Sequence, residues 1–168
     1  LFIGSLNERR KAMIARIEAQ GANVVLFDAP LYGPERDQYI VQAKCVFNAH
    51  FYPTSRFEQA RVSHCLSLGT PVVSERTPQT HPHAAFEDSV FWVDEQQVDT
   101  FFAQQFAKPL FYSEAREQLT RFQEADPIEA YADLLAFAAG YSRTHQQQRP
   151  QEAWLPKRIN LGSGKDYK

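Results

Sequence analysis

Cysteine and long apolar runs are both scarce in this sequence. Its two cysteines, Cys45 and Cys65, lie within apolar stretches and do not form a C-x-x-C pair, which is typical of reduced core residues. A helix that spans a bilayer needs about 18 consecutive apolar residues, and no run approaches that length. No signal peptide is recognisable at the start of the chain. We therefore expect a cytoplasmic location, no membrane span and no need for a disulfide.

An excess of charge of either sign is also missing. Lys and Arg number 18 against 20 Asp and Glu, so the formal net charge is −2. Near neutrality argues against a general nucleic-acid binder or a membrane-surface protein. The dinucleotide fingerprint G-x-G-x-x-G is absent, which argues against a nicotinamide cofactor. His81 and His83 lack the supporting Cys or carboxylate spacing of a zinc motif, so we expect no metal site.

What the chain does contain is an alternation of two hydrophobic periods. Of its 168 residues, 43% are hydrophobic and 13% aromatic, which is enough for one α/β domain. Short apolar runs typical of buried parallel strands occupy residues 1–4, 23–27, 44–48, 72–74 and 90–93. Helical spacing occupies residues 7–20, 34–43, 57–68, 98–107, 113–124 and 127–140. This order predicts a Rossmann-like, doubly wound parallel sheet of about five strands, followed by C-terminal helices.

The composition changes after the last predicted helix. Residues 141–156 are polar and rich in glutamine, with prolines near their end, which is typical of a linker. Residues 1–140 are therefore predicted to form one domain, and residues 157–168, where strand character resumes, to begin another. The chain opens without Met and closes in the middle of a motif, so we expect it to be part of a longer protein. Tyr131, Leu134 and Phe137 recur at helical spacing and predict a packing face.

The first candidate site is the turn between the first predicted strand and the helix that follows it. Gly4 and Ser5 end the strand, and backbone N–H groups at such a helix start can hold a phosphate. Arg9 and Arg10 add positive charge where a diphosphate would lie. The alternative is that Ser5 or Asn7 only caps the helix while both arginines are solvated.

The second candidate site surrounds the ends of the third and fourth predicted strands. Glu58 and Arg61 lie in the first turn of a predicted helix, at the carboxyl edge of the sheet, where ligands collect. His50 and Glu75 follow or end strands at the same edge. One alternative is an ordinary ion pair between Glu58 and Arg61, worth about 0.2–0.5 kcal/mol. The alternative for His50 is packing within its loop.

Three segments of the chain carry a family resemblance. They are FIGSLNERR at residues 2–10, LYGPERDQYIVQAKCVFNAHFY at residues 31–52 and FEQARVSHCLSLGTPVVSE at residues 57–75. In order and spacing they resemble the C-terminal, nucleotide-sugar-binding half of GT-B-fold glycosyltransferases, in the group 1 and spore-coat-like branch. The resemblance implies a donor site for a nucleoside-diphosphate sugar, with Gly4 and Ser5 near the diphosphate and acidic donor contacts on the helix before residues 72–74.

The sequence departs from the family pattern at two positions. Arg56 and His64 stand where many members have glutamates, so we expect Glu58 to take over part of that role. The N-terminal lobe of a GT-B enzyme, which binds the acceptor, has no counterpart here. We therefore expect no catalytic residue in this chain to act alone, and the chain by itself to be inactive.

The end of the chain carries a further resemblance. Residues 158–164, with Gly162, Ser163 and Gly164, look like motif I of class I S-adenosylmethionine-dependent methyltransferases, in which glycines let the backbone pack against the cofactor. The resemblance implies that a methyltransferase domain follows in the parent protein and that S-adenosylmethionine is a cofactor of that domain. This chain itself is expected to hold no cofactor.

Two other functions compete with the donor domain. The absence of glutamates at Arg56 and His64 favours a non-catalytic, Rossmann-like accessory domain of a methyltransferase. A flavodoxin-like or receiver-like binding domain is a third hypothesis, which is weakened because no acidic cluster follows the predicted strands. Nucleic acid and membranes are not expected partners under any of the three.

Overall fold

The computed structural model describes residues 1–27, 30–126 and 131–146. Internal contacts divide the chain into two units, Leu1–Pro127 and Ile128–Lys168. The first unit is an α/β fold with a three-stranded parallel sheet. The described residues contain seven α-helices in all. None of the described helices is long and apolar enough to cross a membrane.

The sheet is formed by β1 (Val46–Asn48), β2 (Val72–Glu75) and β3 (Phe91–Val93), in that order. In the register of the ladder, Val46 lies opposite Val72. The predicted strands at 44–48, 72–74 and 90–93 are therefore confirmed. Each is an apolar run bounded by turn residues, as expected of a strand that is buried on both faces.

The two other predicted strands are not part of this ladder, so the expected count of five strands is wrong for the described residues. Phe2 forms an isolated parallel bridge with Phe47, and its N–H donates to the carbonyl of Val25 at 3.1 Å. Residues 1–3 therefore lie beside β1, and the extended residues around Val25 lie beyond them. Gly4, with a φ of 147°, ends the extended run, and Phe2 is the one residue of it that bridges to β1.

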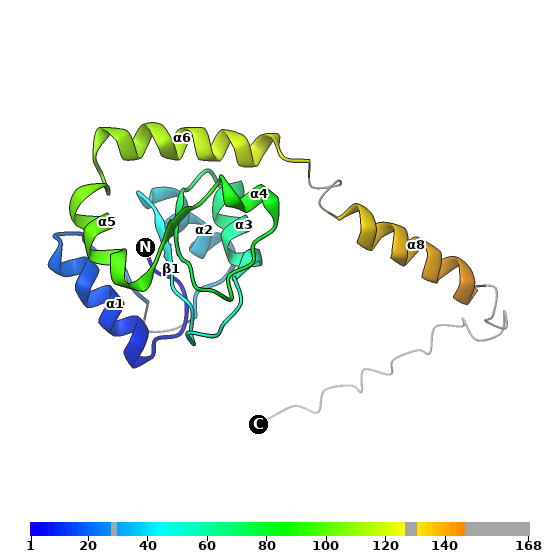
Figure 1. Cartoon of the computed structure of the whole chain (residues 1–168), viewed down its shortest axis with the longest axis horizontal. Coiled ribbons are helices and arrows are strands. Elements are labelled where there is room, and N and C mark those ends of the chain that lie inside the picture. Colours follow the sequence, from blue (N-terminus) through cyan, green and yellow to red (C-terminus); the bar gives the residue numbers. More distant parts are fainter. Residues whose placement is uncertain (28–29, 127–130, 147–168) are drawn as a thin grey trace, which may run out of the picture. The chain divides into compact units, whose positions relative to one another are not determined.

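Helices cover both faces of the sheet (Figure 1). The first face carries α1 (Glu8–Ala19) and α5 (Val98–Gln104), whose apolar side chains share a core with Phe47 and Val73. The opposite face carries α2 (Gly33–Gln42), α3 (Gln59–Ser67) and α4 (Ala84–Glu87), which pack around Val46 and Val72. The alternation of neighbouring strand residues between the two cores follows from the two-residue period of a strand.

A long helix joins the two cores. After the 3-10 turn η1 (Glu95–Gln97) and α5, the helix α6 (Pro109–Glu124) places Phe111 and Ala115 in the first core. Leu119 and Phe122 of the same helix pack against the second core. Because the cores lie on opposite faces of the sheet and Phe111 stacks on Phe91 of β3, α6 passes around the β3 edge.

The helix predictions are confirmed with shifted ends. The helix predicted from residue 113 begins at Pro109, since proline is well suited to a first helical position. The described part of the second unit is α8 (Ala132–Gln146), which extends six residues into the segment predicted as a linker. Leu134 and Phe137 are 61% and 70% exposed, so the predicted packing face is largely uncovered among the described residues of that unit. The remainder of the linker and the motif with Gly162, Ser163 and Gly164 lie outside the described residues.

Candidate functional site

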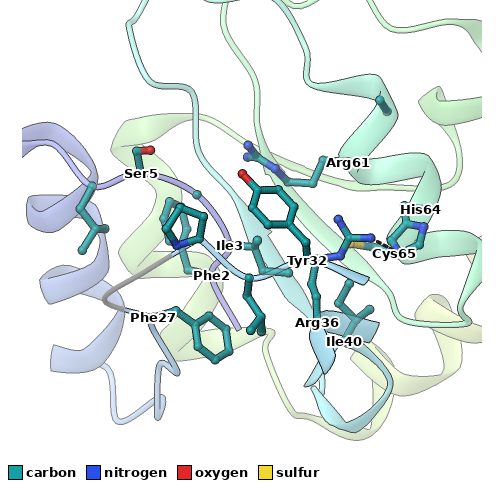
Figure 2. Close-up of a pocket in the computed structure, with 15 residues that line it drawn as sticks. Phe2, Ile3, Ser5, Phe27, Tyr32, Arg36, Ile40, Arg61, His64 and Cys65 are labelled. Carbon is teal, nitrogen blue, oxygen red and sulfur yellow. Dashed lines mark hydrogen bonds between the residues drawn. The ribbon is translucent and has the colours of Figure 1, made fainter. Parts of the chain in front are cut away.

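A cavity of about 750 Å³ opens at the carboxyl end of residues 1–3, between α2 and α3. Residues 1–3 have β1 on one side and the extended residues around Val25 on the other, so the chain order reverses at this point. In open parallel sheets such a reversal leaves a crevice that commonly holds ligands. The bordering residues are Phe2, Ile3, Gly4, Ser5, Leu6, Phe27, Pro30, Leu31, Tyr32, Arg36, Ile40, Ala60, Arg61, His64 and Cys65 (Figure 2).

Gly4 allows two guanidinium groups to approach the turn at the cavity wall. A β-carbon at this position would lie 3.3 Å from Arg10 Nη1 and 3.5 Å from Arg61 Nη2. The φ of 147° is also one that residues with a side chain rarely adopt. The backbone conformation therefore favours glycine here, and a β-carbon would also make a tight contact with Arg10 Nη1.

Arg61 extends from the first turn of α3 toward the end of β1. Its Nη1 donates to Asn48 Oδ1 at 3.0 Å, and the Asn48 amide donates in turn to Ser74 Oγ at 3.0 Å and to Glu58 Oε2 at 3.1 Å. Asn48 and Ser74 lie opposite each other in the ladder, so the sheet itself fixes this anchor. Arginine has five N–H donors, and the contact with Asn48 uses only one of the two terminal nitrogens.

A second arginine borders the cavity from the facing helix. Arg36 of α2 donates to Asp37 Oδ1 from Nε and Nη2, each at 3.3 Å, and its Nη2 lies 2.9 Å from His64 Nε2. His64 Nε2 also lies 2.7 Å from Asp37 Oδ1. The hydrogen bond with His64 is the largest cause that lowers the pKa of Asp37, and the contact with Arg36 lowers it further.

Tyr32 provides the exposed aromatic surface of the cavity. It is the residue immediately before α2 and is 75% exposed. Its ring projects over the cavity and its hydroxyl is turned toward the side chain of Arg61 (Figure 2). An aromatic face beside two cations suits a ligand that has both a flat ring and an anionic group.

Arg9 and Arg10 are held by acceptors within the protein. Arg9 forms a two-point ion pair with Glu75, a second pair with Glu95 at 2.6 Å, and a hydrogen bond to the His50 carbonyl at 3.0 Å. The hydrogen bond that Arg9 donates to Glu75 is the main reason why the pKa of Arg9 is raised. The alternative that both arginines are solvated is therefore wrong, whereas a contact with a diphosphate stays a prediction.

Arg10 is the more deeply buried of the two, with 3% of its surface exposed. Its Nε and Nη2 donate to the Ala49 carbonyl, at 3.0 and 2.6 Å, and its Nη1 donates to the Ser5 carbonyl at 2.8 Å. Burial, followed by the nearby charge of Arg61, lowers the pKa of Arg10. The predicted helix cap is confirmed, because Asn7 Oδ1 accepts from the Arg10 backbone N–H at 2.9 Å.

The histidine and glutamates of the second predicted site form a buried network. His50 is fully buried, with Nδ1 3.0 Å from Glu58 Oε2 and Nε2 3.1 Å from Thr80 Oγ1, which agrees with packing within its loop. Burial alone would raise the pKa of Glu58, but hydrogen bonds from His50 and Asn48 outweigh it and lower the pKa. Glu58 forms its ion pair with Arg10 of α1, at 3.3 Å. Glu75, also fully buried, accepts the His50 backbone N–H at 2.8 Å.

The structure thus separates the predicted residues into two groups. Gly4, Ser5 and Arg61 border the cavity. The others belong to the hydrogen-bonded network beneath it: Asn7, Arg9, Arg10, His50, Glu58 and Glu75. Of the two residues that replace family glutamates, His64 borders the cavity and Arg56 is exposed before α3.

Sequence reasoning missed Tyr32 and Arg36. Both follow the apolar run at residues 23–27, and the available signal was their position at the same edge of the sheet as the Gly4 turn. Two thiols are excluded as reactive groups, because burial raises the pKa values of Cys45 and Cys65 to about 11. Among the described residues, no group of three His, Cys, Asp or Glu side chains is placed to hold a metal ion.

No protein-family model, curated protein or solved structure matches this chain. What the cavity can bind is therefore inferred from the residues that line it.

Proposed function

We propose that this chain is the donor-binding domain of a glycosyltransferase and that the cavity between α2 and α3 holds a nucleoside-diphosphate sugar. The observation that carries the proposal is the placement of Arg36 and Arg61, on facing helices, around one cavity at the carboxyl edge of a parallel sheet. The fold would then be a Rossmann-like, doubly wound one, with residues 1–3 lying beside the three-stranded ladder. The proposed ligand would lie at the carboxyl ends of the strands, where doubly wound folds commonly bind their ligands.

The two arginines suit a diphosphate. A guanidinium group presents paired donors that match two phosphate oxygens, and it stays charged at every physiological pH. Arg61 is anchored through Asn48, so its remaining donors are held in place before the ligand arrives. The turn at Gly4 and Ser5 borders the same cavity, beside the guanidinium group of Arg61.

The nucleoside is accommodated by the rest of the cavity. Tyr32 offers a flat, exposed surface on which a base can stack, an interaction worth about 1–3 kcal/mol in other nucleotide sites. A volume of about 750 Å³ falls within the range of small-molecule sites. The resemblance of residues 2–10, 31–52 and 57–75 to glycosyltransferase donor domains supports the same ligand.

The reaction would be transfer of the sugar from its diphosphate to an acceptor. As the bond to the sugar breaks, negative charge grows on the departing diphosphate, and Arg36 and Arg61 would stabilise it. The acceptor lobe, and with it the catalytic base, belongs to another part of the protein. A methyltransferase domain that uses S-adenosylmethionine would follow this one, in a cytoplasmic, bifunctional parent.

The proposal is tested by calorimetric titration of the chain with UDP, GDP and dTDP, with S-adenosylmethionine as a ligand that should not bind. We expect saturable, micromolar binding of one nucleotide, weakened by added salt. Arg61→Ala should reduce the affinity about 10- to 100-fold, the cost of one charge-assisted contact with phosphate. Arg116→Ala, a cation on the exposed surface of α6, is the matched control and should bind as wild type.

A second function is favoured by one observation. His64 borders the cavity at a position where the resembling family has a carboxylate. If no nucleotide binds, even when the N-terminal lobe of the parent protein is present, the chain is better described as a non-catalytic accessory domain of a methyltransferase.

A further inference from the structure

One ring nitrogen at the cavity wall faces two partners. His64 Nε2 lies 2.7 Å from Asp37 Oδ1 and 2.9 Å from Arg36 Nη2. Asp37 and Arg36 are neighbours in the first half of α2, whereas His64 lies on α3, so the contact spans the two helices that form the cavity. The side chain of His64 is 36% exposed, and solvent can therefore exchange protons with it.

These two contacts require opposite protonation states of the nitrogen. A guanidinium group only donates hydrogen bonds and a carboxylate only accepts them. If Nε2 lacks a proton, it accepts from Arg36 but presents a lone pair to Asp37. If Nε2 carries a proton, it donates to Asp37 but presents an N–H to the N–H of Arg36. The ring can therefore hold Arg36 or Asp37, and not both.

We propose that His64 is a positioning residue for Arg36, and that protonation of His64 releases the Arg36 guanidinium toward the cavity and strengthens binding of an anionic ligand there. The proposal rests on the proposed function, because it takes the diphosphate of a sugar nucleotide as that ligand. The ring of His64 is partly exposed, so it can take up its proton directly from solvent.

The charged or titratable groups near His64 are Arg36, Asp37, Arg61 and Cys65. Protonation places a cation beside Arg36, which repels it, and gives Asp37 a better partner than the 3.3 Å contacts that it makes with Arg36. Arg61, one turn before His64 on α3, also repels Arg36, and an anionic ligand between the two guanidinium groups would offset that repulsion. Cys65 stays neutral because burial raises the pKa of its thiol to about 11. The low pKa of Asp37 keeps that carboxylate ionised throughout.

The first experiment uses the chain without ligand. Nitrogen-15 NMR of the histidine ring and of the arginine Nε groups is recorded from pH 5.5 to 8.0, with His64→Gln and Arg36→Lys used for assignment. We expect the Arg36 Nε signal to shift with the same midpoint as the His64 ring. An Arg36 signal that stays constant while His64 titrates would overturn the positioning role, whatever the chain binds.

The second experiment measures affinity for UDP-glucose, GDP-mannose and dTDP-glucose over the same pH range. The diphosphate of these compounds is esterified at both ends, so it lacks the phosphate group that titrates near pH 6. We expect the affinity of the sugar nucleotide that binds to rise about fivefold from pH 8.0 to 5.5, the effect of one partly screened charge. In His64→Gln the affinity should not change with pH.

Two outcomes distinguish the inference from the proposed function. His81→Gln, which removes another exposed histidine, should keep the wild-type pH dependence. Binding that is equally strong at both ends of the pH range would contradict the role of His64 while leaving the donor site intact. A failure of all three sugar nucleotides to bind at any pH would overturn the ligand, and coupled NMR shifts would then remain as a property of the free cavity.

Discussion

Two pairs of arginines, one on α1 and the other on α2 and α3, differ in what surrounds them. Arg9 and Arg10, on α1, are held by buried carboxylates and by backbone carbonyls. Arg36 and Arg61, on α2 and α3, border a cavity and have only side-chain partners near its wall, Asp37, His64 and Asn48. The first pair joins α1 to the ends of β1 and β2, whereas the second pair lies where the proposed ligand would bind.

The position of an arginine in the sequence therefore does not show whether it stabilises the fold or binds a ligand. Arg9 and Arg10 directly follow a turn that is well suited to a phosphate, yet their partners are Glu75 and the Ala49 carbonyl, each brought from far along the chain. A buried cation that already has charged or carbonyl partners stabilises the fold. A cation with unused donors at a cavity can bind a ligand.

The largest expected effect is on folding and comes from the first pair. Arg9→Ala leaves the fully buried Glu75 without its ion partner, which should reduce the free energy of unfolding by about 3–5 kcal/mol. Arg16→Ala is the matched control on the same helix. Its pair with Asp99 is exposed by 34% and 44%, so its removal should cost only about 0.2–1 kcal/mol.

Urea denaturation followed by circular dichroism measures both variants. Similar small losses for Arg9→Ala and Arg16→Ala would mean that burial does not distinguish the two pairs. The comparison between a structural and a binding pair of arginines would then fail.

The next largest effect is expected where the two pairs meet, at Gly4. Gly4→Ala introduces a side chain at a φ of 147°, next to the guanidiniums of Arg10 and Arg61. It should cost about 1–3 kcal/mol of stability and weaken nucleotide binding as well. Gly140→Ala, in the interior of α8 with no atom near the new methyl group, should instead be neutral or slightly stabilising. Thermal unfolding measures both variants, and melting temperatures that shift in the same direction would contradict the prediction.

Glu58 tests the buried network through pH. Its folded pKa lies below the ordinary value of 4.5, so the ionised carboxylate contributes its full stabilisation above pH 4.5 and loses it as the pH falls through the folded pKa. Glu58→Gln should therefore cost about 1.5 kcal/mol at pH 7 and less at pH 3. Glu8→Gln, whose side chain is 92% exposed, is the control and should show no such pH dependence. Urea denaturation at pH 3 and pH 7 measures both variants. If Glu58→Gln lost the same free energy of unfolding at both pH values, the charge of Glu58 would not be stabilising.

The smallest expected effect on the fold comes from the cavity itself. Tyr32→Ala removes a ring that is 75% exposed, so stability should change by less than about 0.5 kcal/mol. Nucleotide affinity should fall by about 1 kcal/mol, or roughly fivefold, because the base loses its stacking surface. Calorimetry with inorganic pyrophosphate, which has no base, should give the wild-type affinity. Tyr112→Ala on α6 serves as the control, and equal losses for nucleotide and pyrophosphate would exclude stacking.

Much of the fold could be predicted from local patterns. The helix from Glu8 to Ala19 and its Asn7 cap follow from spacing and capping chemistry, and the three strands of the ladder are apolar runs. Residues 1–4 and 23–27 show the same pattern but form only an isolated bridge and a few backbone hydrogen bonds, because a ladder also depends on the conformation of Gly4 and on neighbours distant in the chain. Neither the conformation of Gly4 nor the distant neighbours can be predicted from local periodicity.

The site was less accessible to the same reasoning. Gly4, Ser5 and Arg61 could be identified, because a turn after a strand and the first turn of a helix meet at one sheet edge. The roles of His50 and Glu75 could not be predicted, because their partners Thr80 and Arg9 are separated from them by 30 and 66 residues in the chain. Tyr32 and Arg36 were missed since neither belongs to a recognisable motif.

The course of α6 has a consequence for how the domain fails. Because this one helix contributes Phe111 to one core and Phe122 to the other, detaching it would open both at once. It would also expose apolar side chains of β3, such as Phe91, on which Phe111 stacks. We therefore expect a chain cut before Pro109 to expose apolar surface from both cores and to be prone to aggregation.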